Sequence, residues 1–119
     1  MPRYVILEHF WNGTHWDLML EAGGILKTWA LEAWPGPTSG WIQARRLADH
    51  RPVYLEYEGP VSGDRGMVKR VDSGIFQWIE EHPDRLLVRL DGTLLRGMAD
   101  LEIDPESHQG WRFRMRASG

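Results

Sequence analysis

Apolar residues in this sequence recur at every second position, and no segment repeats them at helical spacing. Residues 15–21 show the pattern most clearly, because Trp16, Leu18 and Leu20 alternate with His15, Asp17, Met19 and Glu21. Successive side chains of a β-strand point to opposite faces, whereas a helix repeats every 3.6 residues. The alternation therefore limits the chain to a fold built from strands.

The alternating segments predict eight or nine short strands, drawn from ten candidate ranges, with little helix. The ranges are 4–10, 15–21, 25–31, 41–47, 53–57, 67–71, 74–78, 86–90, 95–103 and 111–116. Gly23-Gly24 and Asp91-Gly92 are expected to form turns, 59–66 a loop, and 78–84 leaves room for one short helical turn. Short strands at this even spacing are typical of an all-β barrel or sandwich. We expect an all-β fold, a small closed or partly open β-barrel of about eight short strands.

Chain length and the absence of cysteine narrow the class of protein. A sequence of 119 residues predicts a single domain over residues 1–119. With no cysteine, disulfides and thiolate metal sites are excluded. The first ten residues lack a basic segment followed by a long apolar run, and no stretch approaches 18 apolar residues. We therefore expect a cytoplasmic, monomeric protein with no membrane contact.

The charge is mildly negative overall but unevenly spread. A formal net charge of −3 argues against indiscriminate binding to DNA, which relies on broad positive fields. Basic residues nevertheless cluster between positions 45 and 70, and arginines alternate at 112, 114 and 116. Such residues either form a solvated face or steer a phosphate group. The clustered residues are Arg45, Arg46, Arg51, Arg65, Lys69 and Arg70.

His15 and Asp17 are the first candidates for chemistry. On a strand they share one face, about 6.5–7 Å apart along the chain. An imidazole and a carboxylate at this spacing can ligate one divalent ion, with water completing the coordination. The other possibility is a polar strand face exposed to solvent, because a His-x-Asp pair alone is a weak motif.

Whether His9 joins this pair depends on the length of the loop that follows it. A two-residue turn at Asn12-Gly13 would turn His9 to the other face. A three-residue loop would set His9 opposite Asp17, and a five-residue loop would set it opposite His15. An odd loop, in which Gly13 suits a left-handed position, gives two imidazoles and one carboxylate with open positions. That donor set suits Mn²⁺, Fe²⁺, Co²⁺ or Zn²⁺.

His50 and Tyr54 form a second candidate group on either side of Pro52, which predicts an edge strand or a bend there. At the mouth of a barrel they could bind phosphate oxygens or supply a proton to a leaving group. They could equally be a turn histidine and a packed tyrosine. His82 and His108 are flanked by polar turn residues, and we expect both on surface loops.

Around these residues the sequence resembles the 3′-phosphoesterase domain of bacterial DNA ligase D, over nearly the whole chain. That family opens with a strand ending in Glu/Lys-His, then a short loop and His-Tyr-Asp-Phe-Arg-Leu-Glu. Its later blocks are Leu-Lys-Ser-Trp-Ala-Val and Glu-Asp-His followed by Tyr and Phe-Glu-Gly. The matching segments here are Glu8-His9, His15–Glu21, Leu26–Leu31, Ala48-Asp49-His50, Tyr54 and Tyr57-Glu58-Gly59.

The resemblance implies a compact β-barrel and a metal ion, most often Mn²⁺, held by His9, His15 and Asp17. It places His50 and Tyr54 near the scissile phosphate. The implied activity is metal-dependent removal of a 3′-phosphate or 3′-terminal ribonucleoside, a hydrolase reaction that prepares nucleic-acid ends for end-joining repair. The implied substrate is a DNA or RNA–DNA primer-template, and a separate repair ligase or polymerase is an expected partner.

One departure from the family pattern concerns the residue two positions after the metal-ligating aspartate. The family has an arginine there, suited to bidentate phosphate binding, and this chain has Met19. Arg46 or Arg65 could supply the missing charge. The alternatives are a catalytically weakened module that binds metal or DNA ends, or a β-barrel interaction protein without metal.

Overall fold

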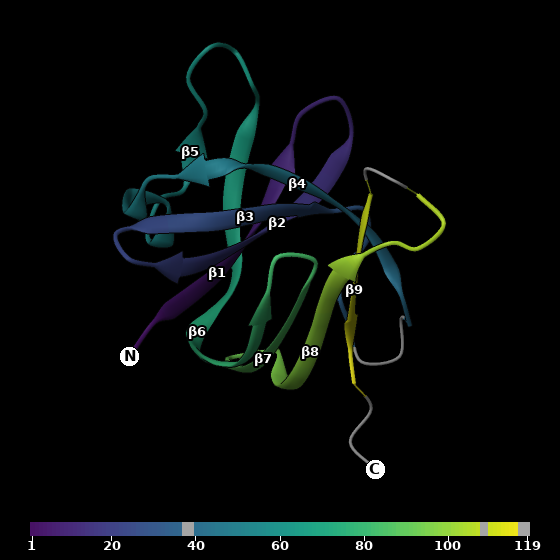
Figure 1. Ribbon diagram of the computed structural model, residues 1–119. Coiled ribbons are helices and arrows are strands. Elements are labelled where there is room, and N and C mark those ends of the chain that lie inside the picture. Colours follow the sequence, from purple (N-terminus) through teal and green to yellow (C-terminus); the bar gives the residue numbers. More distant parts are fainter. Residues whose placement is uncertain (37–39, 108–109, 117–119) are drawn as a thin grey trace.

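A computed structural model describes residues 1–36, 40–107 and 110–116, and over these the chain is almost entirely strand (Figure 1). The alternating sequence pattern is thus confirmed as β-structure. The elements are β1 (Arg3–Phe10), β2 (Thr14–Ala22), β3 (Ile25–Leu31), β4 (Ile42–His50), the 3₁₀ helix η1 (Pro52–Leu55), β5 (Gly59–Pro60), β6 (Met67–His82), β7 (Arg85–Gly92), β8 (Arg96–Ile103) and β9 (Trp111–Met115).

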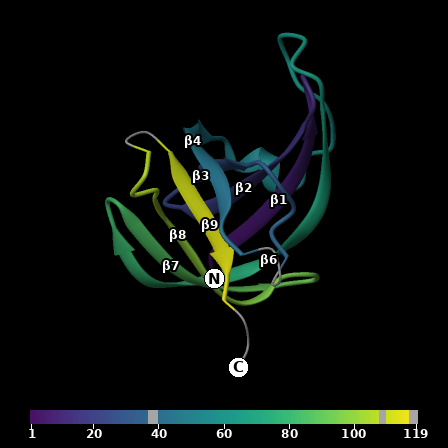
Figure 2. The same cartoon turned by 90° about the vertical axis from the view of Figure 1, so that its right-hand side faces the viewer.

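Eight of these strands close into an antiparallel barrel. The sheet order is β1-β2-β3-β4-β9-β8-β7-β6, and β1 also pairs with β6, which joins the two ends (Figure 2). The short β5 lies outside this ring, paired only with β6. Closure leaves the ring without a free edge, so the small sheet has no exposed template for aggregation. The predicted barrel class is therefore confirmed.

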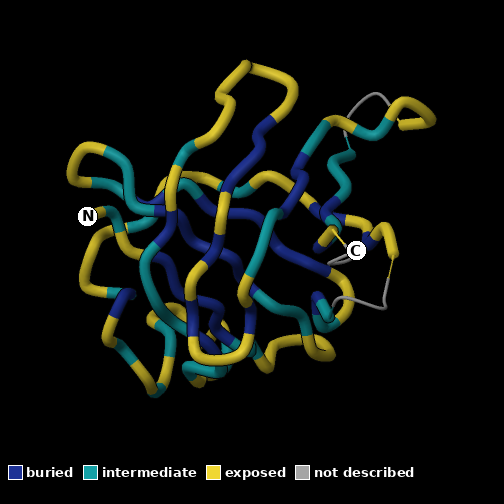
Figure 3. The backbone as a smooth tube through the Cα atoms, turned by 90° about the horizontal axis from the view of Figure 1, so that it is seen from below, coloured by how far each residue is buried: buried dark blue, intermediate teal, exposed yellow. Residues whose placement is uncertain are grey.

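The barrel interior is filled by the side chains of one strand face. In Figure 3, which views the backbone from below, the buried residues are dark blue and lie mostly in the middle of the molecule. Burial of this much apolar surface is the main source of stability for a domain of this size. The interior cluster comprises Tyr4, Ile6, Leu18, Leu20, Trp29, Leu31, Ile42, Ala44, Phe76, Leu86, Val88, Leu90, Leu95, Ala99, Leu101, Phe113 and Met115.

A second apolar cluster covers the outer wall of β1 and β2. Leu55 of η1 packs there, beside partly buried Tyr54 and Tyr57. The segment from η1 to the loop after β5 therefore forms a second layer over the barrel. For this reason β1 is buried on both faces from Tyr4 to Leu7. The buried members of this outer cluster are Val5, Leu7, Met19, Leu26, Leu55 and Val68.

Three local predictions were wrong. Residues 53–57 were expected as a strand, but Pro52 begins a 3₁₀ turn after an extended Arg51, as its fixed φ allows. Residues 67–71 and 74–78 belong to one strand, β6, with irregularities in its register rather than breaks. This strand continues to His82, so within 78–84 only Pro83 and Asp84 form a turn, and it is not helical. The turn expected at Asp91-Gly92 lies at residues 93–95 instead, because β7 continues to Gly92.

A buried polar pair explains why β6 continues through Asp72. The Tyr4 hydroxyl donates to Asp72 Oδ2 over 2.6 Å, and the Leu94 and Leu95 amides donate to the same carboxylate. Burial, followed by this hydrogen bond, raises the pKa of Tyr4 far above its ordinary value. Gly92 leaves no room for a Cβ beside the Tyr4 hydroxyl.

Within the described residues, no helix is long and apolar enough to cross a membrane.

Candidate metal and phosphate site

The β1–β2 hairpin brings the three predicted metal ligands together. His9 pairs with His15 and Leu7 with Asp17, so His9, His15 and Asp17 all project from the outer wall. Five residues separate the paired histidines, which is one of the odd loop lengths that the ligand set requires. Phe10 also pairs with Thr14, so the turn itself is Trp11–Gly13. Asn12 and Gly13 in this turn have positive φ angles of 53° and 103°.

The ligand atoms converge on one point. His9 Nδ1 lies 3.2 Å from Asp17 Oδ2, and His15 Nε2 lies 3.1 Å from Asp17 Oδ1. One ligand atom from each residue can be chosen such that all lie within 4.8 Å of one another. Asp17 is buried at 3% exposure, and both histidines are partly buried. This spacing allows all three side chains to contact a single ion.

Hydrogen bonding leaves acceptors facing each other at that point. His9 Nε2 lies 2.8 Å from the Arg65 carbonyl oxygen, which can only accept a hydrogen bond, so Nε2–H is the donor and Nδ1 is left facing Asp17. Asp17 Oδ1 is buried with His15 Nε2 3.1 Å away, but it accepts no hydrogen bond from any of the described residues. A buried carboxylate oxygen without a donor is costly, and a cation between these atoms would satisfy it. The residues therefore fit a divalent metal.

A cavity of about 470 Å³ opens over the three ligands. The barrel wall forms its floor, and the end of β4, η1 and the loop after β5 form its far side. Its lining includes every residue predicted for catalysis and metal binding. These are His9, His15, Asp17, His50 and Tyr54, which lie there with Met19, Arg45 and Arg65. The site thus lies on the outer wall beneath the second layer, and not at the barrel mouth, where His50 and Tyr54 were expected.

A β-bulge turns His50 toward this cavity. Leu47 pairs with Thr28 and His50 with Leu26, so Ala48 and Asp49 of β4 face the single residue Lys27 of β3. The extra residue changes the alternation and places Leu47 and His50 on the same face. His50 Nδ1 lies 2.8 Å from the Ala48 carbonyl, which leaves Nε2 for a ligand. The Tyr54 ring meets His50 edge-on, with centroids 5.4 Å apart.

Comparison with known proteins identifies the relatives of this chain. A model of the DNA Ligase D 3′-phosphoesterase domain matches residues 7–103. The chain belongs to this family. It is 33% identical over 102 residues to the "Multifunctional non-homologous end joining DNA repair protein LigD" of Mycobacterium tuberculosis, and equally to the corresponding LigD of Mycobacterium bovis. The match covers 79% of this chain but only 13% of each LigD protein.

Within this phosphoesterase-family domain, the two arginines proposed as substitutes for the family arginine have different positions. Arg65 lines the cavity, but its guanidinium donates to the carbonyl and hydroxyl of Ser62. Arg46 lies on the opposite face of β4, over the Trp29 ring at 4.3 Å and paired with Asp49. Arg45, its neighbour, lines the cavity and has no hydrogen-bond or ion-pair partner among the described residues. The placement of Arg46 at the site was therefore wrong.

Met19 shares the face of His15 and Asp17, as the alternation predicts, but it is buried. Its side chain is 1% exposed and belongs to the outer apolar cluster with Leu7 and Leu55. Methionine here packs the floor of the cavity, where a family arginine would carry charge. Of the other histidines, His82 is exposed at the end of β6, whereas His108 lies outside the described residues.

Proposed function

We propose that this domain is a metal-dependent phosphoesterase that removes a 3′-phosphate or a 3′-terminal ribonucleoside from nucleic-acid ends, in the context of end-joining repair. The observation that carries the proposal is the Asp17 carboxylate, buried between two imidazoles, whose Oδ1 accepts no hydrogen bond from the part of the chain that the structure describes. Membership of the 3′-phosphoesterase family supports the reaction class. The names of the LigD relatives support the link to end joining.

His9, His15 and Asp17 are the residues that would hold the ion, with Mn²⁺ the first candidate and Zn²⁺ or Co²⁺ compatible with the same donors. A bound divalent ion supplies Lewis-acid chemistry, because it polarises a phosphoryl oxygen and lowers the pKa of water. The Arg65 carbonyl fixes the orientation of the His9 ring. This support makes the three-residue site rigid before substrate arrives.

Other side chains of the cavity are placed for the phosphate. His50 donates through Nδ1 to Ala48, so its Nε2 faces the substrate and, when protonated, can donate to a phosphate oxygen or to the departing O3′. The Tyr54 hydroxyl is a further donor. The Arg45 guanidinium, which has no ion-pair partner among the described residues, would supply the positive charge that Met19 does not.

The test is hydrolysis of a DNA primer ending in a 3′-phosphate or one ribonucleotide, with Mn²⁺ titrated in. We expect no product in chelator, and loss of at least 100-fold in kcat for Asp17→Asn, since the carboxylate ligand loses its negative charge. Calorimetric titration should show weaker Mn²⁺ binding by the same variant. The matched control is Asp84→Asn, an exposed aspartate in the β6–β7 turn.

Full activity in chelator would contradict the mechanism. Binding of Mn²⁺ by the unmodified protein without turnover on either primer would contradict the activity and favour the weakened, end-binding module. In that case the primer should still compete with inorganic phosphate for the metal-loaded cavity.

A further inference from the structure

A second hollow adjoins the metal and phosphate cavity. It is lined by Trp11, Asn12, Thr14, His15, Ala30, Glu32 and Arg45. Trp11, His15 and Arg45 also line the first cavity, so the two spaces meet along these three side chains. A ligand whose phosphate lies against His15 would therefore reach the second hollow with its next chemical group.

Trp11 stands at the boundary between the two spaces with an accessible ring. It is 43% exposed, although it is a large aromatic side chain in a small turn. Its ring lies nearly parallel to that of His9, at an interplanar angle of 22° and a centroid distance of 6.0 Å. The indole therefore lies beside one of the three candidate metal ligands.

The backbone of this turn is held in place. Gly66 packs so closely against Phe10 and Trp11 that a Cβ at that position would overlap the Phe10 carbonyl. Figure 1 shows the β1–β2 turn and the loop before β6 rising side by side, and Figure 2 shows the same from the side. An exposed aromatic ring on a fixed backbone is suited to stack on a base, because the side chain loses little conformational entropy when the base binds.

We propose that Trp11 stacks on the nucleobase of the 3′-terminal nucleotide whose phosphate lies over His9, His15 and Asp17. This inference rests on the proposed function, which supplies the phosphate. Stacking would hold the end of the strand in register with the metal and without regard to sequence, since every base offers a π-face.

Glu32 indicates which part of the strand enters the second hollow. Its carboxylate repels a second phosphate, whereas it accepts hydrogen bonds from a base amino group or a ribose hydroxyl. The second hollow thus fits the uncharged base and sugar, and the first cavity fits the phosphate. Arg45, between them, faces the point where the two meet.

The kinetic test compares a 3′-phosphorylated primer that has an ordinary terminal base with one whose terminal residue is abasic. Trp11→Ala should lower kcat/KM on the ordinary primer by roughly 5- to 150-fold, the range that base–aromatic stacking gives. On the abasic primer the loss should be under twofold. A defect in folding or metal binding would lower kcat/KM equally on both primers. The ratio of the two losses therefore measures stacking alone. Trp11→Phe should retain most of the rate.

A binding test separates this proposal from the proposed function. The probe is a primer with fluorescent 2-aminopurine as its terminal base, titrated with Mn²⁺-loaded protein. We expect quenching with the unmodified protein and with Trp41→Ala, which removes an exposed tryptophan just before β4 that lines neither cavity, and none with Trp11→Ala. Trp11-dependent quenching without hydrolysis would support stacking and overturn the activity. Stacking would be overturned if Trp11→Ala quenched the fluorescence as much as the unmodified protein does, or if it lowered kcat/KM equally on both primers. It would also be overturned if the unmodified protein did not bind the primer.

Discussion

Arg45 and Arg46 are adjacent arginines whose side chains leave β4 on opposite faces. Arg45 lines the cavity, and Arg46 stacks over Trp29 at the other side of the sheet. The sequence marks both as part of one basic cluster, but composition carries no information about which of two neighbours faces a site. The two faces of the strand alternate from residue to residue, so one of the two arginines must face the cavity. Which one does so is known only once the register of β4 against β3 is known.

These two residues therefore give a matched test of phosphate binding. Arg45→Ala should weaken binding of a 3′-phosphorylated single strand and reduce the slope of log affinity against log salt by about 0.7, the contribution of one phosphate contact. Arg46→Ala should leave the slope unchanged. The measurement is a fluorescence-anisotropy titration at several salt concentrations. Equal slopes for Arg45→Ala and the unmodified protein would place the strand elsewhere.

Met19 shows how far a residue can be interpreted from a family pattern. Its face was predicted from alternation, and the structure places it beside Asp17 on that face. Its burial was not predictable, because the outer cluster forms only when η1 folds back over β1 and β2. An arginine at this position would have to place its charge among Leu7, Leu55 and Val68, where a lone charge is costly.

At the scale of the elements, turns and bulges limited what the sequence could predict. The loop after His9 left three registers open, and each was chemically consistent by itself. His50 reaches the cavity only because of the bulge at Ala48 and Asp49, which no residue pattern in β4 announces. Asp72-Ser73-Gly74 has the composition of a turn, yet Asp72 is buried and bonded to Tyr4. Tertiary partners override local composition at such positions.

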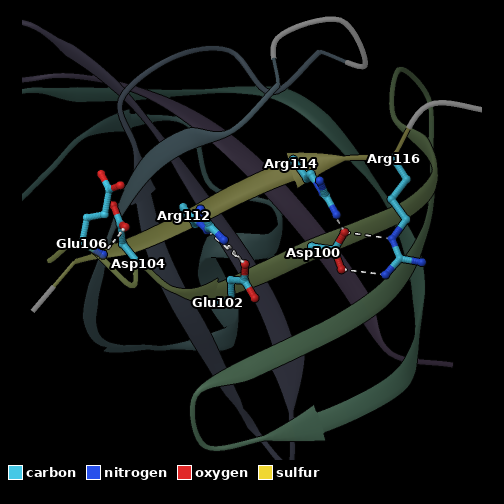
Figure 4. A network of polar contacts seen from close by, with 7 residues as sticks. All are labelled: Asp100, Glu102, Asp104, Glu106, Arg112, Arg114 and Arg116. Atoms are coloured by element: carbon cyan, nitrogen blue, oxygen red, sulfur yellow. Dashed lines mark hydrogen bonds and ion pairs between the residues drawn. The ribbon is translucent and has the colours of Figure 1, made fainter. Parts of the chain in front are cut away.

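The alternating arginines of β9 are used for pairing with β8 and not for phosphate (Figure 4). Arg112 donates twice to Glu102, and Arg114 and Arg116 both donate to Asp100. Arg112 and Arg114 also lie over the Trp41 ring, at 4.0 and 4.3 Å. Each of these cations has an acidic partner.

Asp100 makes the stability of this strand pair depend on pH. Burial alone would raise its pKa, but hydrogen bonds from Arg116 and Arg114 hold the pKa below the ordinary value of 3.8. A carboxyl group with a lower pKa in the folded state stabilises the fold above its unfolded pKa, and this contribution is lost as the pH falls through the folded value. Asp100→Asn should cost about 1–2 kcal/mol at pH 7, since the arginines are half exposed.

The difference in unfolding free energy between Asp100→Asn and the unmodified protein should shrink as the pH is lowered below about 3.8. Urea unfolding at a series of pH values measures it. Asp84→Asn, at an exposed position, should follow the unmodified protein throughout. A difference that stays constant down to the lowest pH at which both proteins fold would assign the loss to packing.

The whole molecule consists of a closed barrel and a thin second layer on one part of its wall. The interior cluster draws residues from all eight barrel strands, whereas the outer cluster draws on β1, β2, β3, β6 and the single turn η1. Every proposed catalytic side chain lies in the space between wall and layer. The barrel thus supports His9, His15 and Asp17 and, through the bulge at the end of β4, His50, whereas η1 of the second layer carries Tyr54.

This division predicts that activity and stability can be separated by two leucine truncations. Leu55 anchors η1 on the outer wall at 4% exposure, and Leu101 lies in the barrel interior at 1%. Leu101→Ala should cost about 2–5 kcal/mol, whereas Leu55→Ala should fall at or below the lower end, because a surface turn can settle into the space left. Per folded molecule, however, Leu55→Ala should lose far more activity, since η1 then no longer fixes Tyr54 against His50. Urea unfolding and primer hydrolysis on the same samples give both quantities. A Leu101→Ala protein that is folded but inactive, beside a fully active Leu55→Ala protein, would show that the barrel alone forms the working site and that the second layer has no part in it.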